Sequence, residues 1–116
     1  MEARAVARHI SVAPRKVRLV ADLVRNRDVE SALDVLRFTN KIGASVINKV
    51  VRSALANAGQ NPDINVDDLY IKTILVDGGP IRRWARFKGR LHISRIRRRH
   101  CHVTVVLDDG VEAEEL

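Results

Sequence analysis

The chain has 116 residues, enough for one domain with its own core, and 46% of them are hydrophobic, which excludes an intrinsically disordered protein. Its single cysteine excludes an internal disulfide framework, and its apolar runs are too short to span a bilayer, so we expect a cytoplasmic protein without membrane contact. The formal net charge is +7, which indicates an anionic partner.

The first predicted elements are a short edge strand and a helix. The strand covers RAVARHI, residues 4–10, and the helix lies within SVAPRKVRLVADLVRNR. Ser11 is a candidate N-cap of this helix, and Pro14 suits its first turn. Apolar residues recur at i, i+3, i+4 and i+7, which is the spacing of one buried helical face. They are Val17, Val20, Ala21 and Val24.

Two further helices are predicted before residue 62. Asp28 is the candidate cap of the second helix, and Thr39 or Asn40 is the candidate cap of the third. Each has an apolar stripe at helical spacing. The stripes are Val29, Ala32, Leu33 and Leu36 in the second helix, and Ile47, Val50, Val51, Ala54, Leu55 and Ala58 in the third. Gly59 and then Asn61-Pro62 end the third helix.

The second half of the chain predicts strands. LYIKTILVD (69–77) is rich in β-branched residues, and HVTVVLDD (102–109) alternates apolar and polar positions. Between them, Asp77-Gly78-Gly79-Pro80 resembles a phosphate-binding glycine loop, but neither phosphate-loop spacing is present. We therefore interpret these four residues as a turn or bulge in which glycine supplies an unusual φ.

A cationic run is the most informative feature of the sequence. Nine Lys or Arg residues and no acid lie between residues 78 and 107, whereas the rest of the chain has 12 basic and 14 acidic residues, a balance of 12 − 14 = −2. The nine are Arg82, Arg83, Arg86, Lys88, Arg90, Arg95, Arg97, Arg98 and Arg99. The charge is thus concentrated on one segment.

The residue pattern also predicts the shape of this segment. If residues 90–107 form a continuous strand, neither face is apolar from 95 to 100, so this part cannot cover the protein's own core. We expect a projecting two-stranded ribbon that turns near Phe87 to Gly89. The fold class is α+β: three helices packed on a small antiparallel sheet, with a long protruding β-hairpin. Within the single domain 1–116, residues 1–79 and 101–109 form the body, 80–100 the basic hairpin and 110–116 an acidic tail.

Nucleic acid is the partner that this hairpin favours. The alternative is a solvated charge run, but nine cations without an acid would repel one another with no local offset. Eight of the nine are Arg, whose planar guanidinium binds phosphate and stacks on bases. Trp84 and Phe87 lie among them and offer further stacking, which favours RNA. Alternatively, the two rings contact each other across the turn.

Catalytic and metal sites are poorly supported. Asp67-Asp68 could be a catalytic pair, but adjacent carboxylates before a strand more often cap or face solvent, and no hydrolase motif is present. His92, His100, Cys101 and His102 could suggest a metal site. Successive strand residues point to opposite faces, however, and no second cysteine completes such a set. We expect no enzyme activity, no metal and no cofactor.

Five segments carry a family resemblance. They are SVAPRKVRLVADLVRNR, SALDVLRFTNK, SALANAGQN, LYIKTILVDGGP and RIRRRHCHVTVVL. In order and spacing they resemble the bacterial ribosomal protein twenty-two of the large subunit, from about Arg8 to Asp109. The resemblance implies a structural constituent of that subunit, on the cytoplasmic ribosome, which binds large-subunit rRNA during assembly and organises several rRNA domains. It also implies contacts with neighbouring ribosomal proteins, a hairpin tip that lines the nascent-peptide exit tunnel, and no homo-oligomer.

The resemblance also implies roles for particular residues. The rRNA-binding set would be Ser11, Arg15, Lys16, Arg18, Arg82, Arg83, Arg86, Lys88, Arg90, Arg95, Arg97, Arg98, Arg99 and His102. The tip facing the nascent peptide would be Trp84, Arg86, Phe87, Lys88, Gly89 and Arg90. The chain departs from the family pattern here, because it has no proline after Pro80 and has four residues between Gly89-Arg90 and Arg95-Ile96, where two are usual. From composition alone, the alternative is a β-arm architectural nucleic-acid-binding protein.

Overall fold

A three-stranded antiparallel sheet forms the base of the body in the computed structural model, which describes residues 1–110. Its strands are β1 (Glu2–Ile10), β2 (Tyr70–Gly78) and β5 (Cys101–Asp108), in the order β1-β5-β2. Val105 of the central strand pairs with Ala5 on one side and with Ile74 on the other. The three predicted strands are therefore present, and residues 4–10 do belong to an edge strand.

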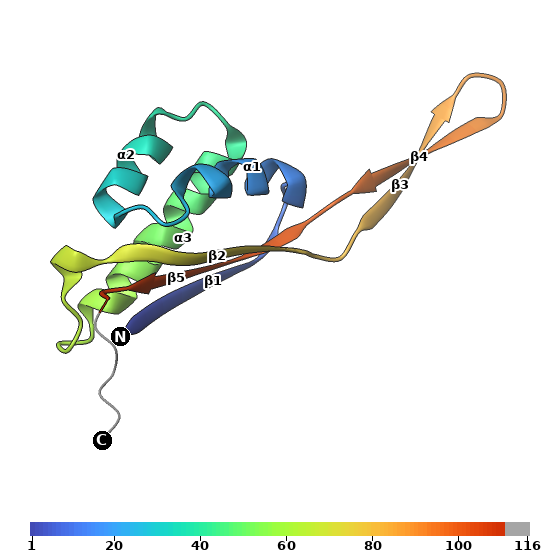
Figure 1. Cartoon of the computed structure of the whole chain (residues 1–116). Helices are drawn as coiled ribbons and strands as arrows, with labels where there is room; N and C mark the ends of the chain where they lie inside the picture. Colours follow the sequence, from blue (N-terminus) through green and yellow to red (C-terminus); the bar gives the residue numbers. More distant parts are fainter. Residues whose placement is uncertain (111–116) are drawn as a thin grey trace.

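Three helices cover one face of this sheet: α1 (Pro14–Val24), α2 (Val29–Phe38) and α3 (Ile42–Gly59) (Figure 1). A short 3-10 helix, η1 (Val66–Asp68), leads into β2. The alternation of β5 places Val103, Val105 and Leu107 fully inside, against the apolar stripes of the helices. The α+β class and the packing of three helices on an antiparallel sheet are confirmed.

The helix caps differ from those expected. Helix α1 begins at Pro14 with Ala13 as its N-cap residue, so Ser11 lies outside the cap. Helix α3 begins after Lys41, and Thr39 instead ends α2, where its hydroxyl donates to the carbonyl oxygen of Val35 at 2.6 Å. Asp28 does hold the N-cap position of α2, but its side chain accepts no capping hydrogen bond. The apolar stripes located these helices better than the polar residues beside them did.

The basic segment forms a separate two-stranded sheet that projects from the body (Figure 1). Its strands are β3 (Arg82–Lys88) and β4 (His92–Arg98), paired from Arg82 with Arg98 to Lys88 with His92. The turn is therefore formed by residues 89–91, two residues later than predicted. The backbone explains the shift: Gly89 and Leu91 both have positive φ, and the His92 N–H donates to the Gly89 carbonyl oxygen at 3.0 Å.

The chain leaves the body for the hairpin at Gly78-Gly79-Pro80. Gly78 is the last residue of β2 and pairs with Cys101, and the Gly79 N–H donates to the His100 carbonyl oxygen at 2.8 Å. Neither glycine has a positive φ, so the expected role of glycine here was wrong. Gly79 lies close to the returning chain instead, because a Cβ there would lie 3.2 Å from the His100 carbonyl oxygen and the junction would have to shift slightly.

Arg18 of α1 and Arg25, the residue that follows α1, cover the free edge of β2. Arg18 donates from Nε and Nη2 to the carbonyl oxygen of Val76, at 3.1 and 2.9 Å, and Arg25 donates from Nη2 to that of Ile74 at 3.1 Å. These outward carbonyls would otherwise be open to pairing with another strand. None of the helices within residues 1–110 is long and apolar enough to cross a membrane.

Candidate nucleic-acid interface

Like charges face each other along the hairpin. Arg82 pairs with Arg98, and Arg83 pairs with Arg97, at the root of the two strands. All these side chains are exposed, and no ion pair among the described residues includes any of them. Directly opposed cations destabilise a strand pair. An anion between or beside these guanidinium groups would therefore stabilise the hairpin.

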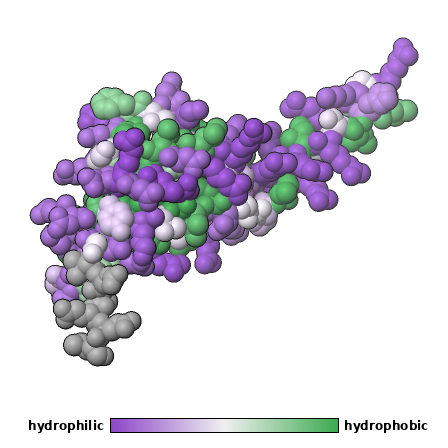
Figure 2. Space-filling model, in the orientation of Figure 1, coloured by the Kyte–Doolittle hydropathy of each residue, from purple (hydrophilic) through white to green (hydrophobic). Residues whose placement is uncertain are grey.

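Two apolar cross-strand pairs interrupt the cations. Trp84 pairs with Ile96 and Phe87 with Ile93. Because Trp84 and Phe87 are three residues apart on one strand, they lie on opposite faces, so the idea that their rings hold each other across the turn is wrong. Both rings remain open, with exposed fractions of 60% for Trp84 and 81% for Phe87. Figure 2 shows the resulting surface, which is mostly hydrophilic with small hydrophobic groups along the hairpin.

A concave surface at the hairpin root joins the hairpin to the start of α1. It encloses about 510 Å³. From the body it is lined by Ser11, Val12, Ala13, Lys16 and Ile42, and from the hairpin and its return by Arg82, Trp84, Arg97, Arg98, Arg99 and His100. Two sets of residues that are distant in sequence, the helix start and the returning strand, thus meet on one surface. Cations surround an exposed indole there, which suits a phosphate beside a base.

The four predicted residues near α1 do not share one environment. Ser11 and Lys16 line the concave surface, and Arg15 is exposed, with no side-chain hydrogen bond to the described residues. Arg18 differs, because two of its nitrogens are already bound to the carbonyl oxygen of Val76. Its first role is therefore to join α1 to β2.

His102 also makes a contact within the body. Its Nδ1 accepts a hydrogen bond from the backbone N–H of His9 at 3.0 Å, and the two rings meet edge to face at 4.9 Å. His9 has φ +57°, where the pairing of β1 with β5 is irregular between Ala7 and Ile10. The contact fixes His102 with Nε2 as its free nitrogen. Nothing in the sequence indicated that His9 would be its partner.

The sheet face opposite the helices carries further cations. A shallow hollow there is lined by Arg4, Val6, Arg8, His9, Asp77, His102 and Thr104. Sequence reasoning missed Arg4 and Arg8, because the body was treated as a nearly neutral whole. The alternation of β1 was the available signal, since Ala3 and Ala5 are buried and the intervening arginine is exposed.

Cys101 and the histidines diverge, as strand alternation predicted. Cys101 is fully buried in the core, and burial raises the pKa of its thiol. His100 and His102 lie on the other side of the strand, where His100 Nδ1 contacts the Arg98 carbonyl oxygen at 3.2 Å. Among residues 1–110, no three His, Cys, Asp or Glu side chains come together as a metal site would require.

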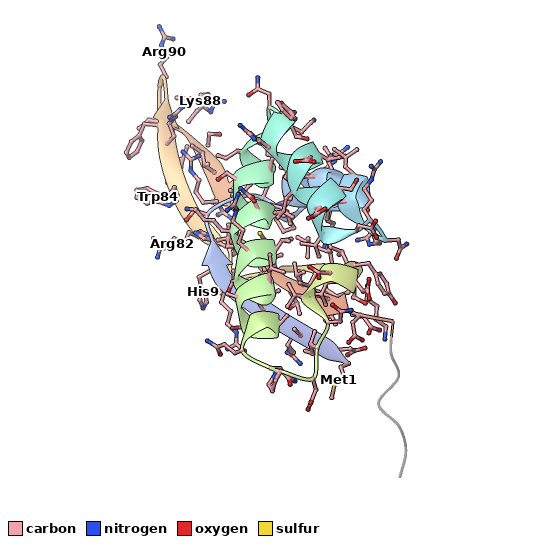
Figure 3. The ribbon with its side chains drawn as sticks, turned by 90° about the vertical axis from the view of Figure 1, so that its left-hand side faces the viewer. Met1, His9, Arg82, Trp84, Lys88 and Arg90 are labelled. Carbon is pink, nitrogen blue, oxygen red and sulfur yellow. The ribbon has the colours of Figure 1, made fainter. Side chains whose placement is uncertain are left out.

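The residues expected at the tip are spread along the hairpin. Arg86, Phe87, Lys88, Gly89 and Arg90 lie at or beside the turn. Trp84 lies nearer the root, below Lys88 and Arg90 in Figure 3, so its placement at the tip is corrected. Leu91, which the prediction did not include in the tip, also lies at the turn, and its side chain is fully exposed.

Comparison with known proteins gives a consistent result over almost the whole chain. A sequence model of the family "Ribosomal protein L22p/L17e" matches residues 5–108. A protein of Desulfotalea psychrophila named large ribosomal subunit protein uL22 is 48% identical over 110 residues, 95% of this chain and 100% of that protein. A Staphylococcus aureus protein of the same name is 46% identical over 112 residues, 97% of this chain and 96% of that protein.

Proposed function

Because this chain belongs to the ribosomal protein L22p/L17e family, we propose that it is a structural constituent of the large ribosomal subunit that binds the rRNA of that subunit. It acts as a scaffold on the ribosome and is not an enzyme. Its chemistry is the neutralisation of phosphate repulsion between RNA segments, which lets those segments pack together.

The observation that carries this proposal is the concave surface at the hairpin root. Lys16 of α1 and Arg98 of β4 line it together with the exposed Trp84. A nucleotide held there would place its phosphate against the cations and its base against the indole. The remaining hairpin cations then follow the RNA backbone outward, and the opposed arginine pairs lose their mutual repulsion. In this proposal, the rRNA-binding residues predicted from the sequence contact the phosphates and bases of the rRNA.

The tip has a separate role in the proposal. Phe87, Lys88, Gly89 and Arg90 lie at the far end of a hairpin that the body does not need for its core, so they act at a distance from it. By family resemblance, this end contacts the nascent peptide in the exit tunnel. The body contacts neighbouring ribosomal proteins, and the protein is incorporated as a single copy.

Removal of the hairpin tests the proposal. Deleting residues 82–98 and joining the ends with Asn-Gly should leave the body folded, because no core residue is lost. The shortened protein should bind large-subunit rRNA at least 100-fold more weakly in a filter-binding assay at low salt. Retained affinity would show that the hairpin is not the RNA-binding element. Loss of cooperative melting would show that the division into body and arm is wrong.

A further inference from the structure

We infer that a groove at the end of the body away from the hairpin binds a basic protein segment that carries at least one apolar side chain. The groove encloses about 600 Å³ between α2, α3 and η1. Its floor is apolar and consists of Val29, Leu33, Leu55, Val66 and Leu69. Leu33 and Leu55 are only partly buried and Val66 is 43% exposed, so apolar surface remains that the protein's own core does not cover.

Carboxylates surround this floor. Asp28, Glu30, Asp34, Asp67 and Asp68 line the groove, and no Lys or Arg is among the lining residues. Within residues 1–110 none of the five carboxylates takes part in an ion pair. Asp68 accepts one hydrogen bond, from the amide of Asn65 at 2.6 Å. The groove therefore combines uncovered apolar surface with five uncompensated negative charges.

Local structure explains only part of this cluster. Asp28 and Glu30 lie at the start of α2, where the helix dipole favours a negative charge. Asp34 lies in the middle of α2, where the dipole offers no such advantage, and η1 is already held by the Asn65 side chain, which accepts from the Asp67 N–H. A partner that supplies cations accounts for the carboxylates that capping leaves unexplained.

The charge also decides between the possible occupants. RNA is disfavoured, because its phosphates would meet five carboxylates. The chain's own hairpin leaves β2 at its Gly78 end (Figure 1), whereas the groove is lined by Asp68 and Leu69, which directly precede the other end of β2 at Tyr70. Residues 111–116 include three glutamates, so they lack the required sign. The complementary partner is a Lys- or Arg-rich segment of another protein, with an apolar side chain for the floor.

Cross-linking within the assembled particle is the first test, and this step rests on the proposed placement in the large subunit. The photoreactive residue p-benzoylphenylalanine replaces Val66 in one version of the full chain and Asp63, outside the groove, in a matched control. We expect position 66 to form a protein adduct that mass spectrometry maps to a peptide with several cations and an apolar residue. An RNA adduct, or no more protein adduct than at position 63, overturns the inference. Failure of either version to sediment with large subunits instead counts against the proposed function.

A binding assay with the full chain tests the groove independently of the ribosome. The probe is a fluorescent peptide that repeats Leu-Lys-Arg, and its control repeats Ser-Lys-Arg. We expect the double variant Asp34→Asn/Asp67→Asn to weaken binding of the leucine peptide at least tenfold, Val66→Ser about fivefold, and Asp63→Asn less than twofold. Equal binding of both peptides, or no effect of Val66→Ser, would indicate general charge attraction and overturn the inference. Self-association of the full chain in sedimentation, abolished by the double variant, would assign the groove to a second copy and also overturn it.

Discussion

Arg18 of α1 and Val76 of β2 are joined by two hydrogen bonds from one guanidinium to one carbonyl oxygen, at 3.1 and 2.9 Å. The family resemblance assigns Arg18 to the RNA-binding set, whereas this geometry gives it a structural role first. The contact with Val76 uses two of the five N–H groups of the Arg18 guanidinium, whereas the Arg15 side chain has no hydrogen bond among the described residues. Loss of Arg18 should therefore lower stability, and loss of Arg15 should not.

Replacing Arg18 by alanine should therefore lower the free energy of unfolding by about 1 kcal/mol, which is below the roughly 1.5–3 kcal/mol of hydrogen bonds to charged groups because Arg18 is exposed to solvent. Arg15→Ala is the matched control, because the Arg15 side chain is exposed and has no hydrogen bond to the described residues. Arg15→Ala should leave stability within about 0.5 kcal/mol, as expected for a surface site. Urea unfolding measures both changes. Equal stability of the two variants would mean that the contact with Val76 contributes nothing in solution.

The sequence predicted the elements of the body well where burial determines them. Val103 and Val105 alternate inward, and the helical stripes face them, because each apolar side chain gains free energy only on the covered side. Cap positions and the hairpin turn were less predictable. A cap or a turn changes the free energy of folding only slightly. Its position can also depend on a backbone conformation that the residue type does not reveal, such as the positive φ of Leu91.

The sequence predicted the positive charge of the candidate RNA-binding site, but not which residues lie side by side in it. Nine cations without an acid identified the hairpin, yet no local pattern showed that Lys16 and Trp84 would line one surface. That proximity depends on where β5 returns beside β1, which is a long-range pairing. The groove lined by Asp34 and Val66 was missed for the same reason, because α2 and η1 are separated by the whole of α3.

The junction between body and hairpin should distinguish two adjacent glycines. Gly79→Ala places a Cβ 3.2 Å from the His100 carbonyl oxygen, so the junction must shift, and we expect a loss of about 1 kcal/mol. Gly78→Ala meets no atom within 4 Å, and its backbone suits alanine, so it should be neutral or slightly stabilising. Urea unfolding of the two variants gives the comparison. Equal effects would show that the close approach at Gly79 is not maintained.

The stability of the hairpin turn should depend on which residue occupies position 91. Leu91 has φ +62°, a conformation that costs an L-residue with a side chain roughly 1 kcal/mol and glycine almost nothing. Leu91→Gly should therefore slow amide exchange across β3 and β4 in the free protein, whereas the β-branched Leu91→Val should speed it. Hydrogen exchange detected by mass spectrometry reports both. The turn is misplaced if glycine and valine have the same effect.

The Cys101 thiol should not react with thiol reagents while the protein is folded. Its thiol is fully buried, and burial raises its pKa, so the folded state holds the proton more tightly than the unfolded state. The resulting stability is fully present below the unfolded-state pKa of about 8.5 and is lost as pH rises through the folded value. Ellman's reagent should therefore react at pH 8 only as fast as the protein opens. Rapid labelling without denaturant would contradict the buried position.

The salt dependence of RNA binding tests the hairpin as a polyelectrolyte contact. If about six of its cations meet phosphates, the slope of log K against log salt should be roughly −4 to −5, so fourfold more salt weakens binding on the order of 10³-fold. Neutralising Arg98 with Arg98→Gln should make the slope shallower by about 1, since each lost contact retains one counterion on the RNA. Arg27→Gln is the control: Arg27 is exposed, and its carbonyl oxygen accepts from Ile71 near the start of β2, away from the hairpin. It should leave the slope unchanged. A parent slope shallower than about −2, or the same change in both variants, would mean that charge on the whole protein, rather than the hairpin, governs binding.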